Sequence, residues 1–371
     1  MSAPLAAAPP AEVLVVVTRR IGDVLLATPL IRSLRSAWPR TAIDVLVFEG
    51  TQGALTGNAD IRRVLTVPQR PGAGRHLALL AALARRYALA LSLVPGDRPT
   101  LYAFIAGRRR AGLLTDSPKE RWKRKLLHAW VPFDNLNTHT VRMHLALAQA
   151  LEVPASNDVH VGWSDADARQ VDLLLGSGAA RQRLAVFHAY PKYRYKMWPQ
   201  EQWIALGHAL AQRGYRIALT GSPDAAEMAY LAELAARLPS GTLNAAGQIT
   251  LAGSAYLVSR GTVYIGTDTA MTHVAAALGV PTVALFGPSN PVKWGPWPRG
   301  HAVERNPWRR CGSQRVANVA LLQGAQACVP CLLEGCDRHV DSVSDCLLHM
   351  PPEKVLAAVE AFEKEGTVAP V

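Results

Sequence analysis

Cysteine is absent from the first 310 residues of this 371-residue chain, and its five cysteines all lie later in the sequence. This distribution excludes a disulfide framework that runs through the whole molecule. No stretch reaches the ~18 consecutive apolar residues of a membrane-spanning helix. Residues 1–11, MSAPLAAAPPA, lack the basic segment and long apolar core of a secretory signal. We therefore expect these residues to form a disordered tail and the protein to be cytoplasmic.

Acidic residues are scarce: 28 Asp and Glu stand against 40 Lys and Arg, which gives a net charge of +12. Such a surface favours anionic partners, namely phosphorylated ligands, nucleic acid or an anionic membrane face. A generally basic proteome is the alternative explanation. Because the sequence contains no recognisable RNA- or DNA-binding motif, we expect no nucleic-acid partner.

Short apolar segments alternate along the chain with segments of helical periodicity, which is typical of an α/β fold with parallel sheets. Strands are expected at residues 13–17, 42–49, 63–68, 89–95, 104–114, 184–189, 215–222, 241–247, 262–267 and 281–289. Helices are expected at residues 25–37, 77–87, 138–153, 198–214, 224–238, 250–261, 272–279 and 352–364. Residues 117–135 are expected to form a loop or short helix, and the chain from about residue 290 to be irregular until its last helix.

A polar linker near residues 154–164 divides the chain, and 371 residues with 49% hydrophobic content can fill two cores. The expected domains are residues 12–160 and residues 161–350, the second with a Cys-rich tail. Residues 351–371 form a C-terminal helix and tail. Each half is predicted to form a doubly wound sheet, in which ligands bind beyond the carboxyl ends of the strands.

The turn after the first strand reads TRRIGDVLL, with a single carboxylate at Asp23 beside Gly22. A carboxylate at a ligand-binding edge can act as a general base, and Gly22 allows an unusual backbone angle or the close approach of a ligand. The alternative is that Asp23 caps the helix over residues 24–37. The residues alone favour neither interpretation.

Two strand-to-helix turns in the second half suit an anion. HAYPKYRYKMWP (188–199) carries three basic residues within five positions, and GTDTAMTH (266–273) opens a helix with small residues. A helix N-terminus and a nearby lysine together form a natural diphosphate site. The alternatives are a solvated basic loop at the first turn, and at the second a helix cap by Asp268 and a packed core histidine at His273.

RIGDVLLATPLIRSLR (20–35), K-x-W-P (196–199) and GTDTAMTHVAAALGVPTVALFGPSNP (266–291) occur in this order. Together they resemble the heptosyltransferases of glycosyltransferase family 9, which build the inner core of lipopolysaccharide; the resemblance covers roughly residues 12–300. It implies a GT-B fold, with two Rossmann-like domains facing a cleft. It also implies inverting, metal-independent transfer from a nucleotide sugar, usually ADP-heptose in the C-terminal domain, to a lipid-linked acceptor in the N-terminal domain.

The resemblance also implies residue roles: Asp23 matches the catalytic base, and Lys196 matches the lysine that stabilises the departing diphosphate. The donor is expected to contact Lys192, Arg194, Ile249, Asp268, Thr269, Ala270, Met271, Thr272 and His273. The family often has glycine where this chain has Ala270. It also often has a ribose-binding acid near the position of Ala225, where Asp224 or Glu227 could substitute.

Basic residues in the first half suit an anionic acceptor at the inner face of the cytoplasmic membrane, with Trp122 and Trp130 nearby; a solvated loop is the alternative. The acceptor is expected to contact Arg20, Gly22, Arg108, Arg109, Arg110, Arg121 and Lys123. We thus expect a peripheral heptosyltransferase. The alternatives are a GT-B enzyme that uses another nucleotide sugar, a sugar-nucleotide epimerase and a non-catalytic anion-binding protein.

Two further patterns bear on metals. Asp165-Ala166-Asp167 matches the DxD element of metal-dependent transferases, but it opens a helix and is better explained as acids of the first turn. No cofactor is expected in catalysis. Four cysteines follow the pattern C-x2-C-x4-C-x9-C, at Cys328, Cys331, Cys336 and Cys346. They could hold a structural zinc or iron, remain free or redox-active thiols, or form disulfides; Cys311 is spare.

Overall fold

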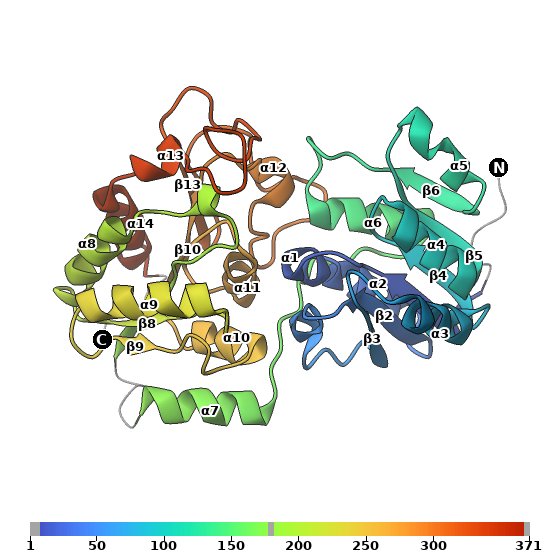
Figure 1. Ribbon diagram of the computed structural model, residues 1–371, viewed down its shortest axis with the longest axis horizontal. Helices are drawn as coiled ribbons and strands as arrows, with labels where there is room; N and C mark the ends of the chain where they lie inside the picture. Colours follow the sequence, from blue (N-terminus) through green and yellow to red (C-terminus); the bar gives the residue numbers. More distant parts are fainter. Residues whose placement is uncertain (1–7, 177–181, 367–371) are drawn as a thin grey trace. The chain divides into compact units, whose positions relative to one another are not determined.

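The computed structural model describes residues 8–176 and 182–366, which divide into two compact units (Figure 1). The first unit contains Met1–His160 and Ala302–Asn306, and the second contains Val161–His301 and Pro307–Val371. Residues 302–306, which were expected in the C-terminal domain, thus belong to the first unit. Residues 1–7 of the expected tail lie outside the described residues. Pro10 and Ala11 are held in place, because their carbonyl oxygens accept hydrogen bonds from Thr41 and Ala42.

A six-stranded sheet of order β3-β2-β1-β4-β5-β6 forms the first unit, and all its neighbouring strands are parallel. The strands are β1 (Glu12–Val16), β2 (Ala42–Phe48), β3 (Arg63–Val67), β4 (Tyr87–Ser92), β5 (Gly107–Leu114) and β6 (Ala129–Pro132). The helical segments are α1 (Ile21–Leu25), α2 (Thr28–Ala37), η1 (Gln52–Leu55), α3 (Ala73–Leu83), α4 (Asp97–Ala106), η2 (Pro118–Glu120), α5 (Arg121–Arg124) and α6 (Thr140–Ala150).

The continuous apolar run of β1 is explained by burial on both faces of this sheet. Leu14 and Val16 pack in one cluster with Tyr87 of β4 and Tyr102 of α4. Their neighbours Val13 and Val15 point to the opposite face and are also fully buried. Parallel strands that are buried in this way are connected by helices on both faces of the sheet. The connecting loops therefore lie at the amino and carboxyl ends of the strands.

The second unit is built on a seven-stranded sheet of order β12-β13-β11-β10-β7-β8-β9, which is parallel except for the β12–β13 pair. Its strands are β7 (Arg183–His188), β8 (Tyr215–Leu219), β9 (Leu243–Asn244), β10 (Val263–Thr267), β11 (Thr282–Phe286), β12 (Gln314–Val316) and β13 (Val319–Gln323). Its helical segments are α7 (Asp165–Leu175), η4 (Arg194–Lys196), α8 (Gln200–Ala211), α9 (Ala225–Arg237), α10 (Leu251–Ser259), α11 (Ala270–Leu278), α12 (Pro291–Trp294), α13 (Asp345–Leu348) and α14 (Pro352–Lys364).

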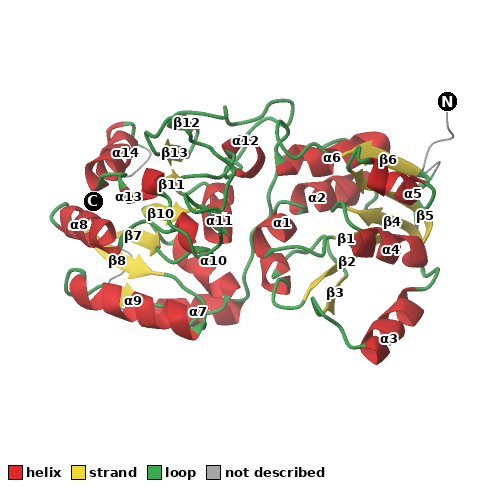
Figure 2. Ribbon diagram, turned by 45° about the horizontal axis from the view of Figure 1, so that its top comes forward, coloured by secondary structure: helices red, strands yellow, loops and turns green. Residues whose placement is uncertain are grey.

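Alternate residues of β11 show that helices cover both faces of this sheet (Figure 2). Leu285 packs in a cluster with Trp203 of α8 and Phe362 of α14. Phe286 packs in a different cluster with Ala276 of α11 and with Trp308. Helix α14, which was expected as a separate C-terminal element, is therefore part of the core of the second unit. Among the described residues, no helix is both long and apolar enough to cross a membrane.

The expected elements differ most from the structure at the following places. The helix expected over residues 25–37 is two helices, α1 and α2, which meet at Thr28-Pro29 because proline lacks the amide hydrogen that a continuous helix needs. Helix α4 covers residues 97–106, where the expected strand 104–114 began too early. Strand β6 lies in the expected loop at residues 117–135. Strands β12 and β13 extend the second sheet into the region that was expected to be irregular.

A buried carboxylate joins three strands of the first sheet. Asp44 of β2 is fully buried and accepts hydrogen bonds from Arg62 at 2.8 Å, from Arg63 at 2.6 Å and from the Tyr87 hydroxyl at 2.8 Å. Burial raises the pKa of Asp44, but the hydrogen bonds from Arg62, Arg63 and Tyr87 outweigh it and lower the pKa to about 2. The ionised form of Asp44 is therefore the one that the fold stabilises.

We expect the substitution Asp44→Asn to lower the free energy of unfolding by about 3 kcal/mol, because it leaves two arginines without their buried partner. Guanidinium denaturation near pH 7 would measure this change. The folded-state pKa of Asp44 lies below its ordinary value. Its contribution to the stability of the wild type is therefore complete above about pH 4 and is lost as the pH falls toward 2.

Glu12→Gln is the matched control, because it removes the second, partly exposed partner of Arg62. It should lower the free energy of unfolding by less than about 1 kcal/mol. Equal losses in the two variants would contradict a special role for Asp44.

Candidate functional site

The order of the parallel strands reverses once in each sheet, between β1 and β4 in the first unit and between β7 and β10 in the second. The loops that follow the two strands on either side of this reversal run in opposite directions. They leave a crevice at the carboxyl ends of the strands, which commonly binds ligands. Asp23 follows β1, Lys196 follows β7, and Asp268 follows β10. Three residues predicted from the sequence thus lie at the switch points of the two sheets.

Asp23 is the third residue of the five-residue helix α1. The N-cap position belongs to Arg20, so Asp23 is not the N-cap residue that the capping alternative requires. The Asp23 side chain is 13% exposed, and its Oδ1 lies 3.8 Å from Nε of Arg19. Gly22 has helical backbone within α1, so it does not supply an unusual backbone angle. Arg19 is a neighbour that the sequence analysis did not single out.

Lys196 is positioned by an apolar anchor two residues later in the chain. The Trp198 side chain is fully buried, packs edge-on against Trp203 with ring centroids 4.9 Å apart, and donates a 2.9 Å hydrogen bond to the Met350 carbonyl. The Ser344 hydroxyl also donates to the Tyr195 carbonyl at 2.7 Å. These contacts fix the 3-10 turn η4 that carries Lys196, so the lysine projects from a rigid loop.

The Lys196 ammonium forms an ion pair with Asp268, with 2.5 Å between Nζ and Oδ2. The Ser289 hydroxyl donates to the same carboxylate oxygen at 2.6 Å. Burial raises the pKa of Asp268, but Lys196 and Ser289 more than offset this effect and hold the pKa below its ordinary value. Ser289 follows β11 in the sequence GPSNP and was missed, although its place at the carboxyl end of a strand was the available signal.

The N-terminus of α11 lies beside this ion pair. Thr269 is the N-cap residue, and no side chain caps the helix, so Asp268 does not serve as the expected alternative cap. Met271 and Thr272 are buried, and the Thr272 hydroxyl donates to the Thr267 carbonyl, which turns it back toward the strand. Thr269 and Ala270 are partly exposed. The accessible part of this turn is therefore Thr269, Ala270 and their backbone amides.

His273 is 6% exposed, and its Nδ1 has no hydrogen-bond partner among the described residues. Burial is the main reason that its pKa falls to about 4; Asp268 opposes the shift and Lys196 reinforces it. The imidazole is thus neutral at physiological pH. It remains available as a hydrogen-bonding group close to the ion pair.

The other predicted donor contacts lie around the same edge. Lys192 and Arg194 are exposed in the loop after β7, and Ile249 is buried in the turn after β9. Of the two candidate ribose acids, Asp224 is the N-cap of α9 and accepts from the amides of Ala226 and Glu227. The Glu227 carboxylate instead accepts from the Ser222 hydroxyl in the turn after β8. Because Asp224 is occupied as a cap, Glu227 is the stronger candidate.

Arg108, Arg109 and Arg110 do not join the Asp23 turn. They occupy the amino-terminal half of β5, and Arg109 pairs with Leu89 near the start of β4. Asp23 follows the carboxyl end of β1, whereas the register places Arg109 and Arg110 level with Val13 and Leu14, before that end. Arg110 stacks on Phe104 and donates to His128.

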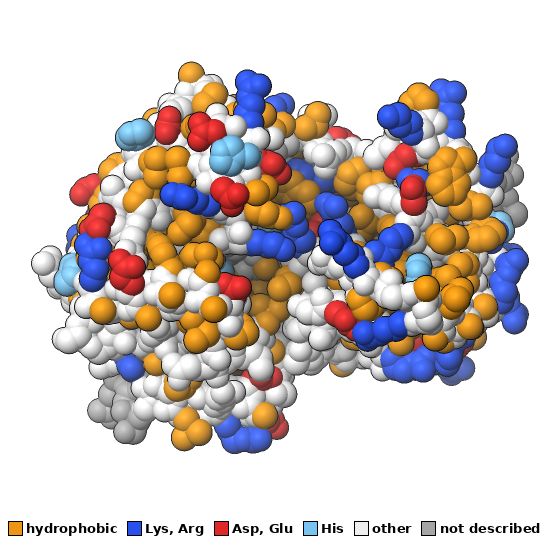
Figure 3. Space-filling view, viewed as in Figure 1, with side chains coloured by type: hydrophobic (Ala, Val, Ile, Leu, Met, Phe, Trp, Pro, Cys, Tyr) orange, Lys and Arg blue, Asp and Glu red, His pale blue; other side chains and the backbone are white. Residues whose placement is uncertain are grey.

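The second basic segment does lie at the carboxyl edge, because α5 follows the end of β5. Lys123 is buried and forms ion pairs with Asp97 and Glu120 at 2.8 and 2.7 Å, so its charge is already balanced. Arg121 is exposed, and the Trp122 side chain is 49% exposed. Figure 3 shows basic and hydrophobic side chains gathered over α5 and β6.

Asp165 and Asp167 of the Asp165-Ala166-Asp167 sequence lie in the first turn of α7, as predicted. The Ser164 hydroxyl accepts from the Asp167 amide, and the Asp167 carboxylate accepts from the Ser164 amide, which completes a capping box. Asp167 also accepts a 2.6 Å hydrogen bond from Thr250. These acids therefore stabilise the start of α7.

The four cysteines of the tail lie close to one another. None of the five cysteines is in a disulfide, and Cys346 is buried. Burial, followed by the neighbouring Cys331, Cys328 and Cys336, raises the pKa of the Cys346 thiol to about 12. Within residues 8–176 and 182–366, no three His, Cys, Asp or Glu side chains are arranged to hold a metal ion. The zinc or iron site stays a prediction.

The sequence profile of glycosyltransferase family 9 (heptosyltransferase) matches residues 100–321. Lipopolysaccharide heptosyltransferase 1 of Pseudomonas aeruginosa is 27% identical over 381 residues, which covers 95% of this chain and 98% of the relative. Lipopolysaccharide heptosyltransferase 3 of Escherichia coli K12 is 26% identical, covering 74% and 82%.

Solved structures agree with this match at the level of the fold. ADP-heptose lipopolysaccharide heptosyltransferase II of E. coli superposes with a TM-score of 0.72 at 21% identity, covering 95% of this chain and 99% of that structure. Both units have the Rossmann-like strand order that the GT-B fold combines in one chain. The family match and the fold lead to one conclusion: this chain belongs to glycosyltransferase family 9, the heptosyltransferase family.

Proposed function

We propose that this glycosyltransferase moves a heptose from ADP-heptose to a lipid-linked lipopolysaccharide core acceptor, with inversion at the sugar carbon and without a metal ion. The observation that carries the proposal is the Lys196–Asp268 ion pair at the switch point of the second sheet. It supplies a cation beside a helix N-terminus, an arrangement suited to a diphosphate. The relatives named lipopolysaccharide heptosyltransferase support the choice of sugar and acceptor.

Asp23 acts as the general base in this proposal. Its carboxylate accepts the proton of an acceptor hydroxyl while that oxygen forms a bond to the sugar carbon. The bond from this carbon to the diphosphate oxygen breaks on the opposite face, so the configuration inverts and ADP leaves. One carboxylate is sufficient, because no covalent sugar–enzyme intermediate forms.

The donor diphosphate is assigned to Lys196, Thr269 and the first amides of α11. Negative charge grows on the phosphate as the bond breaks, and a cation fixed in place before the reaction stabilises that charge. Asp268 holds Lys196 in position. Glu227 is assigned to the ribose because its carboxylate faces the turn after β8.

The acceptor is assigned to the carboxyl edge of the first sheet, where Arg20 and Arg121 can meet its anionic groups. Exposed Trp122 beside basic side chains suits peripheral attachment to the inner face of the cytoplasmic membrane. Arg108–Arg110 lie in the amino-terminal half of β5, before this edge, and are assigned no acceptor contact. Because the chain belongs to an enzyme family, a non-catalytic anion-binding role is set aside.

We expect Asp23→Asn to lower kcat by at least about 100-fold, because the acceptor hydroxyl loses its base. Transfer from ADP-heptose to heptose-deficient core lipid would measure this loss, with UDP- and GDP-sugars as competing donors. The control is Asp158→Asn, which replaces an exposed carboxylate of the same unit and should keep the wild-type rate.

Full activity of Asp23→Asn would show that the base lies elsewhere. Preferred use of a UDP- or GDP-sugar would replace the proposed donor, and epimerisation without transfer would identify an epimerase.

Lys196→Gln should lower kcat/KM for ADP-heptose by about 100-fold and weaken the binding of ADP, because the phosphate loses its fixed cation. Transfer kinetics and calorimetric titration with ADP would test both effects. The matched control is Arg237→Gln, which removes an exposed ion pair with Glu201 in the same unit. Unchanged ADP affinity in Lys196→Gln would rule out the assigned phosphate contact.

Transfer should continue at the wild-type rate in excess EDTA, because Asp167 of the Asp-x-Asp sequence is already engaged in the capping box of α7. The same assay with and without EDTA would show this directly, and recovery of a lost rate by Mg²⁺ or Mn²⁺ would contradict it. Elemental analysis of the purified protein tests the predicted zinc or iron separately. If the wild type contains equimolar metal and variants in which the tail cysteines are replaced contain none, the metal site lies in the tail.

A further inference from the structure

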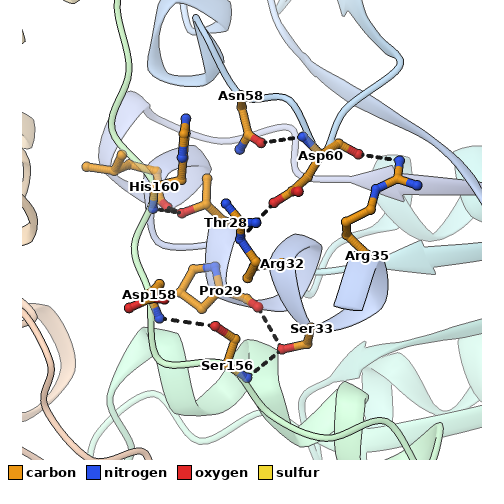
Figure 4. A network of polar contacts seen from close by, with 11 residues as sticks. Thr28, Pro29, Arg32, Ser33, Arg35, Asn58, Asp60, Ser156, Asp158 and His160 are labelled. Carbon is orange, nitrogen blue, oxygen red and sulfur yellow. Dashed lines mark hydrogen bonds and ion pairs between the residues drawn. The ribbon is translucent and has the colours of Figure 1, made fainter. Parts of the chain in front are cut away.

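The junction between α1 and α2 is closed by the hydroxyl of Thr28, the first residue of α2. Thr28 is fully buried, and its Oγ1 donates a 2.7 Å hydrogen bond to the Leu25 carbonyl, at the last residue of α1. The same oxygen accepts a 2.9 Å hydrogen bond from the backbone amide of His160 (Figure 4). A hydroxyl has a single proton, so the incoming amide bond directs that proton toward Leu25.

Helix α1 depends on such contacts, because five residues are far too few for a helix to be stable by itself. Its end is held by two buried side chains. Thr28 donates to the Leu25 carbonyl, and the His144 ring nitrogen Nδ1 of α6 donates to the Leu26 carbonyl at 3.0 Å. Asp23 lies two residues before Leu25. The direction of its carboxylate therefore follows from how firmly this end of the helix is fixed.

The amide that completes the clamp belongs to the segment leading to the second unit. Ser156 is anchored in the same way, since its amide donates to the Ser33 hydroxyl at 2.8 Å. His160 is the last residue of this part of the first unit, and Trp163 already packs against Tyr256 in the second unit. Only Val161 and Gly162 separate these two anchored residues. Thr28 thus contacts both the helix of Asp23 and the end of the linker.

We propose that Thr28 is a positioning residue for catalysis: its hydroxyl holds α1 so that Asp23 is directed at the acceptor hydroxyl, and the linker amide at His160 keeps that hydroxyl oriented. The inference rests on the proposed role of Asp23 as base. It assigns a catalytic consequence to a buried threonine that itself touches no substrate.

Thr28→Val and Thr28→Ala both remove the hydroxyl, the first with nearly the same volume. We expect either variant to lower kcat for heptose transfer by about 10- to 100-fold with little change in the KM for ADP-heptose, because misplacement by about 1 Å has an effect of this size. Thr28→Ser, which keeps the hydroxyl, should restore kcat to within about threefold of the wild type. Hydrogen exchange of the amides of residues 24–27 should quicken in Val and Ala variants and not in the Ser variant.

Ser33→Ala is the matched control, because Ser33 anchors Ser156 and donates only to Pro29 within α2. It removes the anchor of Ser156 but leaves both hydrogen bonds of Thr28 in place, so it should keep kcat within about twofold. A similar kcat loss in Ser33→Ala, or wild-type kcat in a folded hydroxyl-free Thr28 variant, would overturn the proposal.

A double-mutant cycle with Asp23→Asn separates this inference from the proposed function. If Thr28 acts through Asp23, Thr28→Val should cause no further loss in the Asp23→Asn background. A full additional loss would show that Thr28 acts otherwise and would overturn the inference alone. Wild-type rate in Asp23→Asn itself would overturn the proposed base and this inference together.

Discussion

Parallel pairing of the strands is the constraint on which the rest of this structure depends. A parallel sheet must be crossed by helices and buried on both faces, so its strand-ending loops gather at one edge. The reversal of strand order then opens that edge at a single point in each sheet. Asp23, Lys196 and Asp268 come from distant parts of the sequence, and each lies beside one of these two points.

Apolar anchors convert this general placement into defined positions. Trp198 lies two residues from Lys196, and its burial fixes a loop that otherwise carries exposed basic residues. The Cys-rich tail supports the same loop, because Ser344 hydrogen-bonds to Tyr195 and directly precedes α13. In the first unit, Thr28 and His144 give α1 a comparable support through hydrogen bonds. The reactive groups are thus held by residues that bind no ligand.

The sequence was sufficient to predict the α/β class, two Rossmann-like sheets and most crossover helices, because periodicity is a local property. It also placed Asp23, Lys196 and Asp268 in strand-ending turns. The break at Thr28-Pro29 was missed because the apolar pattern continues from α1 into α2. Lys123 resembled an exposed basic residue because its burial and its pairing with the distant Asp97 leave no mark in the local sequence. Contacts between distant residues, such as those of Asp44 or Ser289, have no local pattern.

Residues 302–306 have a separate consequence for how this protein can be divided. Arg142 donates to the Val303 carbonyl, and Asn306 bonds with His139 and Asn137, so this short piece of the C-terminal half completes the first unit. The chain therefore passes between the units three times. A single junction at 160/161 does not separate complete domains. Recombination between family members would exchange intact folding units only if the 302–306 segment travelled with the N-terminal partner.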